Sequence, residues 1–100
     1  MIDMIKFNNK EEFDLHYKAM ADEYGDDFND DLCIEGNHDI TLGWLRKIAE
    51  KVGYTNVSVS DRTDCTDYVE IDVSGNPQCF FEFYGSDTSY CNGKIRIWWD

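Results

Sequence analysis

The chain of 100 residues has few of the features that metal centres, secreted disulfide frameworks or membrane proteins require. It contains one proline, two histidines and four cysteines, and no two cysteines are spaced as a Cys-x-x-Cys pair. Zinc sites normally use such short pairs. The N-terminus has an acid within a short apolar stretch and no cationic leader, which argues against a signal peptide. We therefore expect a cytoplasmic protein with reduced thiols, no metal and no cofactor.

Basic residues are also scarce. Nine Lys and Arg stand against 21 Asp and Glu, which gives a formal net charge of −12. This charge argues against direct binding to nucleic acid or to an anionic membrane and favours a basic partner. Hydrophobic residues make up 42% of the chain and aromatic residues 15%, which is too apolar for a disordered acidic tail. The length predicts a single domain over residues 1–100.

The first half of the chain has a helical pattern. Asn9 can cap a first helix, and Gly25 can end it. Its apolar positions recur at helical spacing: Phe13, Tyr17, Met20 and Tyr24. A second helix is predicted over residues 41–52, followed by Gly53 as its left-handed C-terminal residue. Residues 26–38 show no period, and we expect them to be irregular.

The second half of the chain alternates between apolar and polar residues with a period of two. Strands are predicted at residues 57–60, 68–73, 79–84 and 95–99, with another short strand at 4–8. Turn signals separate the later strands at residues 74–77, 85–87 and 92–93. Consecutive short strands of this kind favour an antiparallel meander. The sequence therefore predicts an α+β fold, with two helices packed on one face of a four- to five-stranded, mainly antiparallel sheet.

One stretch, residues 22–39, concentrates acids without a single Lys or Arg. We call it the acidic segment, and its acids are Asp22, Glu23, Asp26, Asp27, Asp30, Asp31, Glu35 and Asp39. Clustered like charges repel one another on folding, and the sequence shows no compensation. One interpretation is a solvated loop with a frayed helix end. The other is a surface for a basic partner, whose field would speed association by ~10–10³-fold.

Part of the acidic segment also partly matches a calcium-binding loop. Asp27, Asn29 and Asp31 match the first three ligand positions of an EF-hand loop. The match fails beyond them, because Leu32 replaces the glycine of the sharp turn and His38 replaces the bidentate glutamate. The sequence therefore does not predict a calcium site.

The sheet face that the two helices cannot cover is the second candidate surface. Its predicted outward residues are Tyr68, Glu70, Asp72, Phe80, Glu82, Tyr84, Arg96 and Trp98. Carboxylates at Glu70 and Asp72 would stand ~6.6 Å apart on one side of their strand, a spacing suited to a row of Arg or Lys. The exposed aromatic residues would supply contact area. The alternative is ordinary cross-strand pairing, with Trp98 over Phe80 or Tyr84.

Cysteine and histidine residues offer a third possibility. Cys33 and His38 lie close in the sequence, and such a pair can form a nucleophile or half of a metal site. Cys79 and Cys91 are expected to fill the core or the sheet edge, and His16 to shield the apolar stripe of the first helix. No phosphate-binding glycine loop and no Ser-His-Asp order is present. We expect no catalytic site, and a small Cys/His enzyme or metal-binding domain remains the alternative.

Taken over its whole length, this small, acidic, aromatic-rich chain resembles the proteins that phages use to block bacterial defence, such as anti-CRISPR and anti-restriction inhibitors. Some of these mimic the phosphate backbone of DNA. The resemblance is one of general character, without a shared motif, and assigns no individual residue. It implies only a mode of action, which is occupation of a positively charged nucleic-acid channel. From the residues themselves, we expect the acidic segment and the open sheet face to hold a basic protein surface of this kind. Immunity proteins that neutralise nuclease toxins have the same character and form an alternative.

Overall fold

The computed structural model describes residues 4–35, 39–62, 65–74 and 87–99, with the backbone alone for 87–91. In chain order these residues form β1 (Met4–Lys6), α1 (Lys10–Tyr24), β2 (Cys33–Glu35), β3 (Ile40–Thr41), α2 (Leu42–Val52), the 3₁₀ helix η1 (Tyr54–Asn56), β4 (Val57–Ser60), β5 (Tyr68–Asp72), β6 (Asp87–Cys91) and β7 (Lys94–Trp98). Within this part of the chain, neither α-helix is long and apolar enough to span a bilayer.

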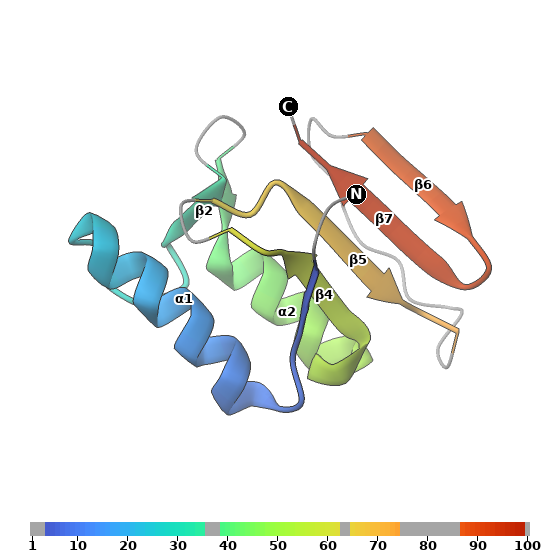
Figure 1. Ribbon diagram of the computed structural model, residues 1–100, viewed down its shortest axis with the longest axis horizontal. Coiled ribbons are helices and arrows are strands. Elements are labelled where there is room, and N and C mark those ends of the chain that lie inside the picture. Colours follow the sequence, from blue (N-terminus) through green and yellow to red (C-terminus); the bar gives the residue numbers. More distant parts are fainter. Residues whose placement is uncertain (1–3, 36–38, 63–64, 75–86, 100) are drawn as a thin grey trace.

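Both helices pack on one side of an antiparallel sheet (Figure 1). Its strand order is β1-β4-β5-β7-β6, and β2 and β3 form a separate two-stranded sheet. The predicted α+β fold is therefore confirmed.

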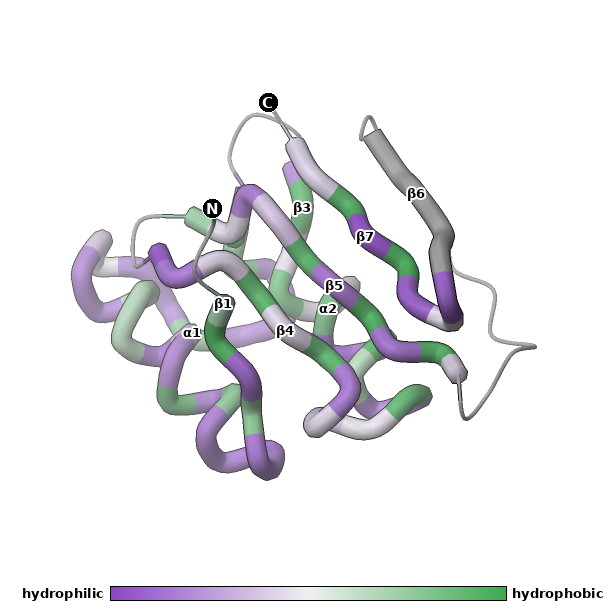
Figure 2. Tube along the Cα trace, turned by 45° about the vertical axis from the view of Figure 1, so that its right-hand side comes forward, coloured by the Kyte–Doolittle hydropathy of each residue, from purple (hydrophilic) through white to green (hydrophobic). Residues whose placement is uncertain are grey.

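The core lies between the helices and the apolar face of the sheet. Val59 of β4 pairs with Val69 of β5, which pairs with Ile97 of β7, and all three side chains are fully buried. The alternation of apolar and polar residues along β4, β5 and β7 is visible in Figure 2. Because side chains on a strand alternate between faces, this row fixes the register and leaves the polar residues on the opposite face.

The predicted helix boundaries are largely confirmed. The Asn9 side chain accepts a hydrogen bond from the Glu12 N–H at 2.9 Å, and α1 ends at Gly25 with φ of 70°. Gly53 follows α2 with φ of 98°, but its ψ of 138° is extended rather than left-handed helical. The difference arises because the chain turns directly from Gly53 into η1.

The prediction that residues 26–38 are irregular is wrong for β2. This strand pairs antiparallel with β3, and its Ile34 is buried. Three residues are too few to show a period in the sequence, and the strand exists because β3, just before α2, supplies its partner.

The C-terminal hairpin differs from its prediction. The predicted strand 79–84 lies outside the described residues, and the strand that forms the hairpin with β7 is β6. The predicted turn is confirmed: Asn92 and Gly93, with φ of 54° and 78°, form a two-residue connection between β6 and β7. Positive φ at both positions is typical of a type I′ turn. A Cβ added at Gly93 would lie 2.8 Å from the Ser74 Cβ.

We expect Gly93→Ala to lower the free energy of unfolding by roughly 1–3 kcal/mol, because alanine is strained at positive φ and would overlap Ser74. Asn92→Gly in the same turn is the control, since glycine accepts the same φ and should change stability by less than about 0.5 kcal/mol. Urea denaturation measures both. Equal stability of the two variants would contradict this account of the turn.

Candidate functional site

The acidic segment is held by the first turn of α2. The Leu42 N–H donates to the Leu32 carbonyl at 2.8 Å, and the Gly43 N–H donates to the Asp30 carbonyl at 2.9 Å. Backbone groups of the segment thus satisfy N–H groups that would otherwise lack partners at a helix N-terminus. A Cβ at Gly43 would lie 2.9 Å from the Asp30 Cβ, so the close approach requires glycine at this position.

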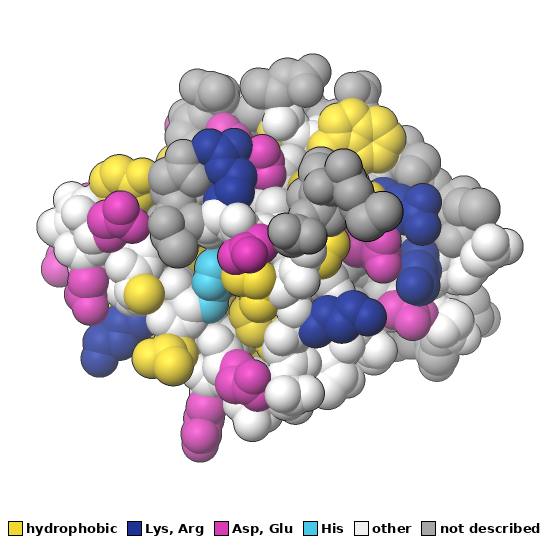
Figure 3. Space-filling model, in the orientation of Figure 1, with side chains coloured by type: hydrophobic (Ala, Val, Ile, Leu, Met, Phe, Trp, Pro, Cys, Tyr) yellow, Lys and Arg dark blue, Asp and Glu magenta, His cyan; other side chains and the backbone are white. Residues whose placement is uncertain are grey.

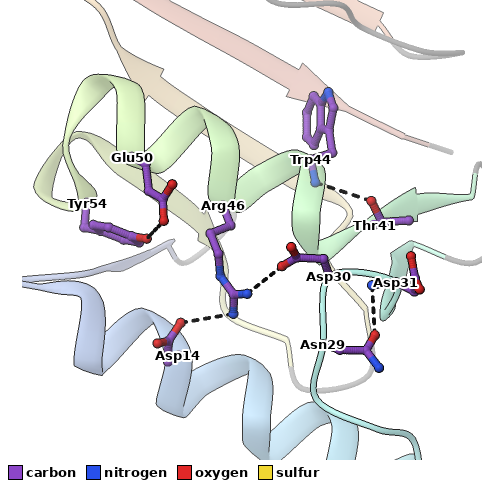
Figure 4. Close-up of polar contacts among 9 residues, drawn as sticks. All are labelled: Asp14, Asn29, Asp30, Asp31, Thr41, Trp44, Arg46, Glu50 and Tyr54. Carbon is purple, nitrogen blue, oxygen red and sulfur yellow. Dashed lines mark hydrogen bonds and ion pairs between the residues drawn. The ribbon is translucent and has the colours of Figure 1, made fainter.

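The side chain of one arginine of α2, Arg46, also holds the acidic segment (Figure 4). Arg46 Nη1 lies 2.6 Å from Asp30 Oδ1, and Nη2 lies 3.3 Å from Asp14 Oδ1 on α1. Its guanidinium carbon lies 5.3 Å from the centre of the Phe28 ring, within cation–π range. Arg46 therefore neutralises one acid of the segment and fastens the segment to both helices.

The other exposed acids of the segment have no such partner. In the part of the chain that the structure describes, no ion pair is formed by Asp22, Glu23, Asp26, Asp27, Asp31 or Asp39, all of which are exposed. We call these six residues the acidic end. Asp22 and Glu23 belong to the last turn of α1, which contains no basic residue. Acidic side chains at this end of α1 are visible on the left of Figure 3.

Carboxylates from both sides of Cys33 in the sequence act on its thiol. Burial raises the pKa of the Cys33 thiol, and the carboxylates of Asp39, Glu35 and Asp26 raise it further against a backbone hydrogen bond from Glu35. A raised pKa favours the protonated thiol, which is the opposite of what an activated nucleophile needs.

Three residues of the acidic end line an open depression. It has a volume of about 250 Å³ and is lined by Asp26, Asp27, Asn29, Asp31, Leu32 and Cys33. The Asn29 carboxamide oxygen accepts the Asp31 N–H at 2.9 Å, which fixes the loop at the rim (Figure 4). Three carboxylates around one depression suit a basic side chain, whose charged head binds carboxylate.

The calcium hypothesis gains no support from this geometry. Among the described residues, no group of three or more His, Cys, Asp or Glu is placed to hold a metal ion. The oxygen that Asn29 would offer already accepts a hydrogen bond from the backbone. His38, which figures in the metal and nucleophile hypotheses, lies outside the described residues.

Glu35 is a correction to the sequence prediction. The sequence predicts it on the partner surface, but its side chain is only 5% exposed. The pairing of β2 with β3 draws this part of the segment against the body of the domain, so that Cys33 faces outward while Ile34 and Glu35 are buried. The acidic segment therefore divides into an exposed part and a packed part.

On the open sheet face, the structure describes one aromatic stack. Trp98 stacks on Tyr68, its neighbour across β5 and β7, with ring centroids 6.3 Å apart and planes 13° apart. Phe80, Glu82 and Tyr84, which the sequence predicts on this face, lie outside the described residues. The cross-strand interpretation of Trp98 thus holds for the pair β5–β7.

The acids of the same face are largely neutralised. Glu70 lies between two bases of β7, with Oε2 3.1 Å from Arg96 Nε and Oε1 3.5 Å from Lys94 Nζ. Asp72 accepts hydrogen bonds from the N–H and hydroxyl of Ser74, which lower the pKa of its carboxyl group. Among the described side chains of β5 and β7, two acids on this face thus stand against two bases, and Glu70 is already occupied by the kind of base that it was predicted to bind in a partner.

His16 shields the apolar stripe of α1, as the sequence suggests. Its ring packs against Tyr17 and Phe7, with centroids 4.8 and 6.0 Å apart. Within the described structure, its buried Nε2 has no hydrogen-bond partner. Burial lowers the pKa of His16 below the ordinary value of 6.5, and the Asp61 carboxylate opposes this shift.

A Glu→Gln substitution should change the free energy of unfolding in opposite directions at the two ends of α1. Glu23→Gln removes a negative charge from the negative end of the helix dipole and should raise the free energy of unfolding by roughly 0.3–1 kcal/mol. Glu11→Gln, in the first turn, should lower it by a similar amount. Thermal and urea unfolding at low and high salt measure both effects, which should shrink with salt. Loss of stability in both variants would contradict the dipole argument.

His16 predicts a loss of stability under mildly acidic conditions. Because the pKa of His16 is lower in the folded state, the unfolded state binds more protons as pH falls through 6.5 toward the folded-state value, and stability falls over that window. His16→Phe keeps an aromatic ring without a titrating group. Denaturation between pH 7.5 and 5.5 should show wild type losing stability relative to this variant. A constant difference between the two proteins would refute the shift.

Comparison of the chain with protein-family models, with curated proteins and with solved structures found no match.

Proposed function

We propose that the acidic end binds the basic surface of a nucleic-acid-handling protein and inhibits it, in the manner of phage anti-CRISPR and anti-restriction inhibitors. The observation that carries this proposal is that six exposed acids have no ion pair within the described residues. The nearest segment acid with a partner, Asp30, holds Arg46. The field of the remaining six is available to another molecule.

The placement of these charges favours a partner surface over a merely solvated loop. Asp22 and Glu23 stand at the helix end where the dipole opposes negative charge. The loop beyond them is not frayed, because α2 and Arg46 hold it. The exposed acids thus cost folding free energy, and the segment that carries them is ordered. An ordered cluster of unpaired acids is the arrangement that would attract a basic partner electrostatically.

Inhibition would follow from competition for basic side chains. The depression at the acidic end would receive an Arg or Lys of the partner, with its charge near Asp26, Asp27 and Asp31. A basic side chain so engaged no longer binds a phosphate group of nucleic acid. The bacterial cytoplasm, where such targets act, is the proposed location.

Two alternatives remain distinguishable. An immunity protein against a nuclease toxin would use the same surface, and the identity of the bound protein separates the two cases. A Cys/His enzyme would need an activated thiol, and the raised pKa of Cys33 disfavours it. Reaction of Cys33 with a thiol reagent at neutral pH should accordingly be slow.

The test is reversal of the acidic end without disturbing its anchor. Asp26, Asp27 and Asp31 are changed to Lys, and Asp30 is kept because it holds Arg46. Immobilised wild type should retain basic nucleic-acid-binding proteins from a bacterial lysate at low salt and release them as salt rises. The triple variant should slow association of the recovered protein by at least about tenfold, because such charges act mainly on encounter.

The charge-matched control reverses Glu11, Glu50 and Asp61, three exposed acids outside the acidic segment, and changes the net charge by the same amount. Because Glu11 lies in the first turn of α1 and Glu50 accepts a hydrogen bond from the Tyr54 hydroxyl, circular dichroism first establishes that this variant is folded. It should retain most of the binding. The recovered protein should also lose nucleic-acid binding when wild type is added. Binding that is indifferent to salt and to the acidic-end reversals would rule out this mechanism.

A further inference from the structure

The open face of β5 and β7 has its charges sorted by strand. Glu70 and Asp72 of β5 are acidic, whereas Arg96 and Lys94, their partners across the register, are basic. The third row of the same face is the aromatic pair of Tyr68 and Trp98. Each row thus joins an acid to a base or one aromatic ring to another. Lys/Arg and Asp/Glu side chains also lie side by side on the right of Figure 3.

We propose that this face packs on the same face of a second copy of the chain, around a two-fold axis that runs parallel to the strands. Such an axis, midway between β5 and β7, places β5 of one copy over β7 of the other. Because the register is unbroken, every row then meets its complement: Glu70 faces Arg96 of the second copy, and Asp72 faces its Lys94.

The aromatic row follows the same rule, with Tyr68 over Trp98 of the second copy. Two sheets that pack face to face keep their strands within about 30° of each other. The Glu70–Arg96 row is the middle one of the three, so this twist displaces it least. Exposed fractions of 45% for Arg96 and 43% for Lys94 leave both bases accessible beside Glu70.

A two-fold axis across the strands would not give this match. It would place β5 over β5 of the second copy, with Glu70 facing Glu70 and Arg96 facing Arg96. Like charges in contact across an interface cost several kcal/mol. The sorting of charge by strand therefore selects the axis parallel to the strands.

Charge also favours a second copy over other occupants of this face. The chain carries a net charge of −12, so two copies can approach closely only through a surface on which negative charge does not predominate. The described β5–β7 face, with two acids and two bases, is such a surface. A strongly basic partner would meet Lys94 and Arg96 there, and would be drawn instead to the acidic end. The inference is thus independent of the proposed function.

The test is a pair of charge reversals that are complementary across the axis. Glu70→Arg alone would place the new arginine over Arg96 of the second copy, and Arg96→Glu alone would place the new glutamate over Glu70 of the second copy. Sedimentation equilibrium should show wild type associating to a dimer, and each variant associating at least about tenfold more weakly. An equal mixture of the two variants should form a heterodimer, because both of its cross-axis rows are then attractive.

The mixture separates an interface from a structural role. Each variant also loses the ion pair within its own chain, and mixing cannot restore that pair. Circular dichroism and thermal unfolding confirm that each variant is folded. The two single variants Asp72→Lys and Lys94→Glu, alone and mixed, repeat the test on the neighbouring row. Wild type that stays monomeric at high concentration would overturn the proposal. So would a mixture that fails to associate while wild type dimerises, since this would exclude the axis parallel to the strands.

Discussion

The described structure depends on the anchoring of an acidic segment to the start of α2. Two backbone N–H groups of α2 and the side chain of Arg46 hold that segment, and Arg46 also binds Asp14 of α1. Each ion pair is partly exposed and worth at most about 1 kcal/mol by itself. Their combined effect is geometric, because they keep a chain of like charges in one place where self-repulsion would otherwise spread it.

The few bases of the chain are distributed unevenly, and this distribution sets the properties of each surface. Arg46 is engaged with the acidic segment, while Lys94 and Arg96 lie over Glu70 on the sheet. The described side chains of β5 and β7 are therefore balanced in charge, whereas the acidic end keeps its negative field. The two surfaces suit different interactions: long-range attraction of a basic partner at one, and close complementary packing at the other.

Local elements of the fold were predictable because their signals are local. Helix α1 begins after Asn9 and ends before Gly25, and both residues act through contacts within one helical turn. Asn92 and Gly93 form a turn that their own backbone preferences specify. The strand β2 was missed because three residues show no period and its partner strand is only two residues long. Arg46 was missed as an anchor because its partners lie 16 and 32 positions away in the sequence.

The sequence by itself determined the fold class, through its change from helical to alternating periodicity, and it determined the excess of negative charge. It also placed that charge in one segment. Only the tertiary structure decided which acids keep their field, because Asp30, Glu70 and Glu35 are neutralised or buried through contacts between distant segments. Neutralisation and burial depend on distances in space, and these distances cannot be read from the spacing of residues along the chain.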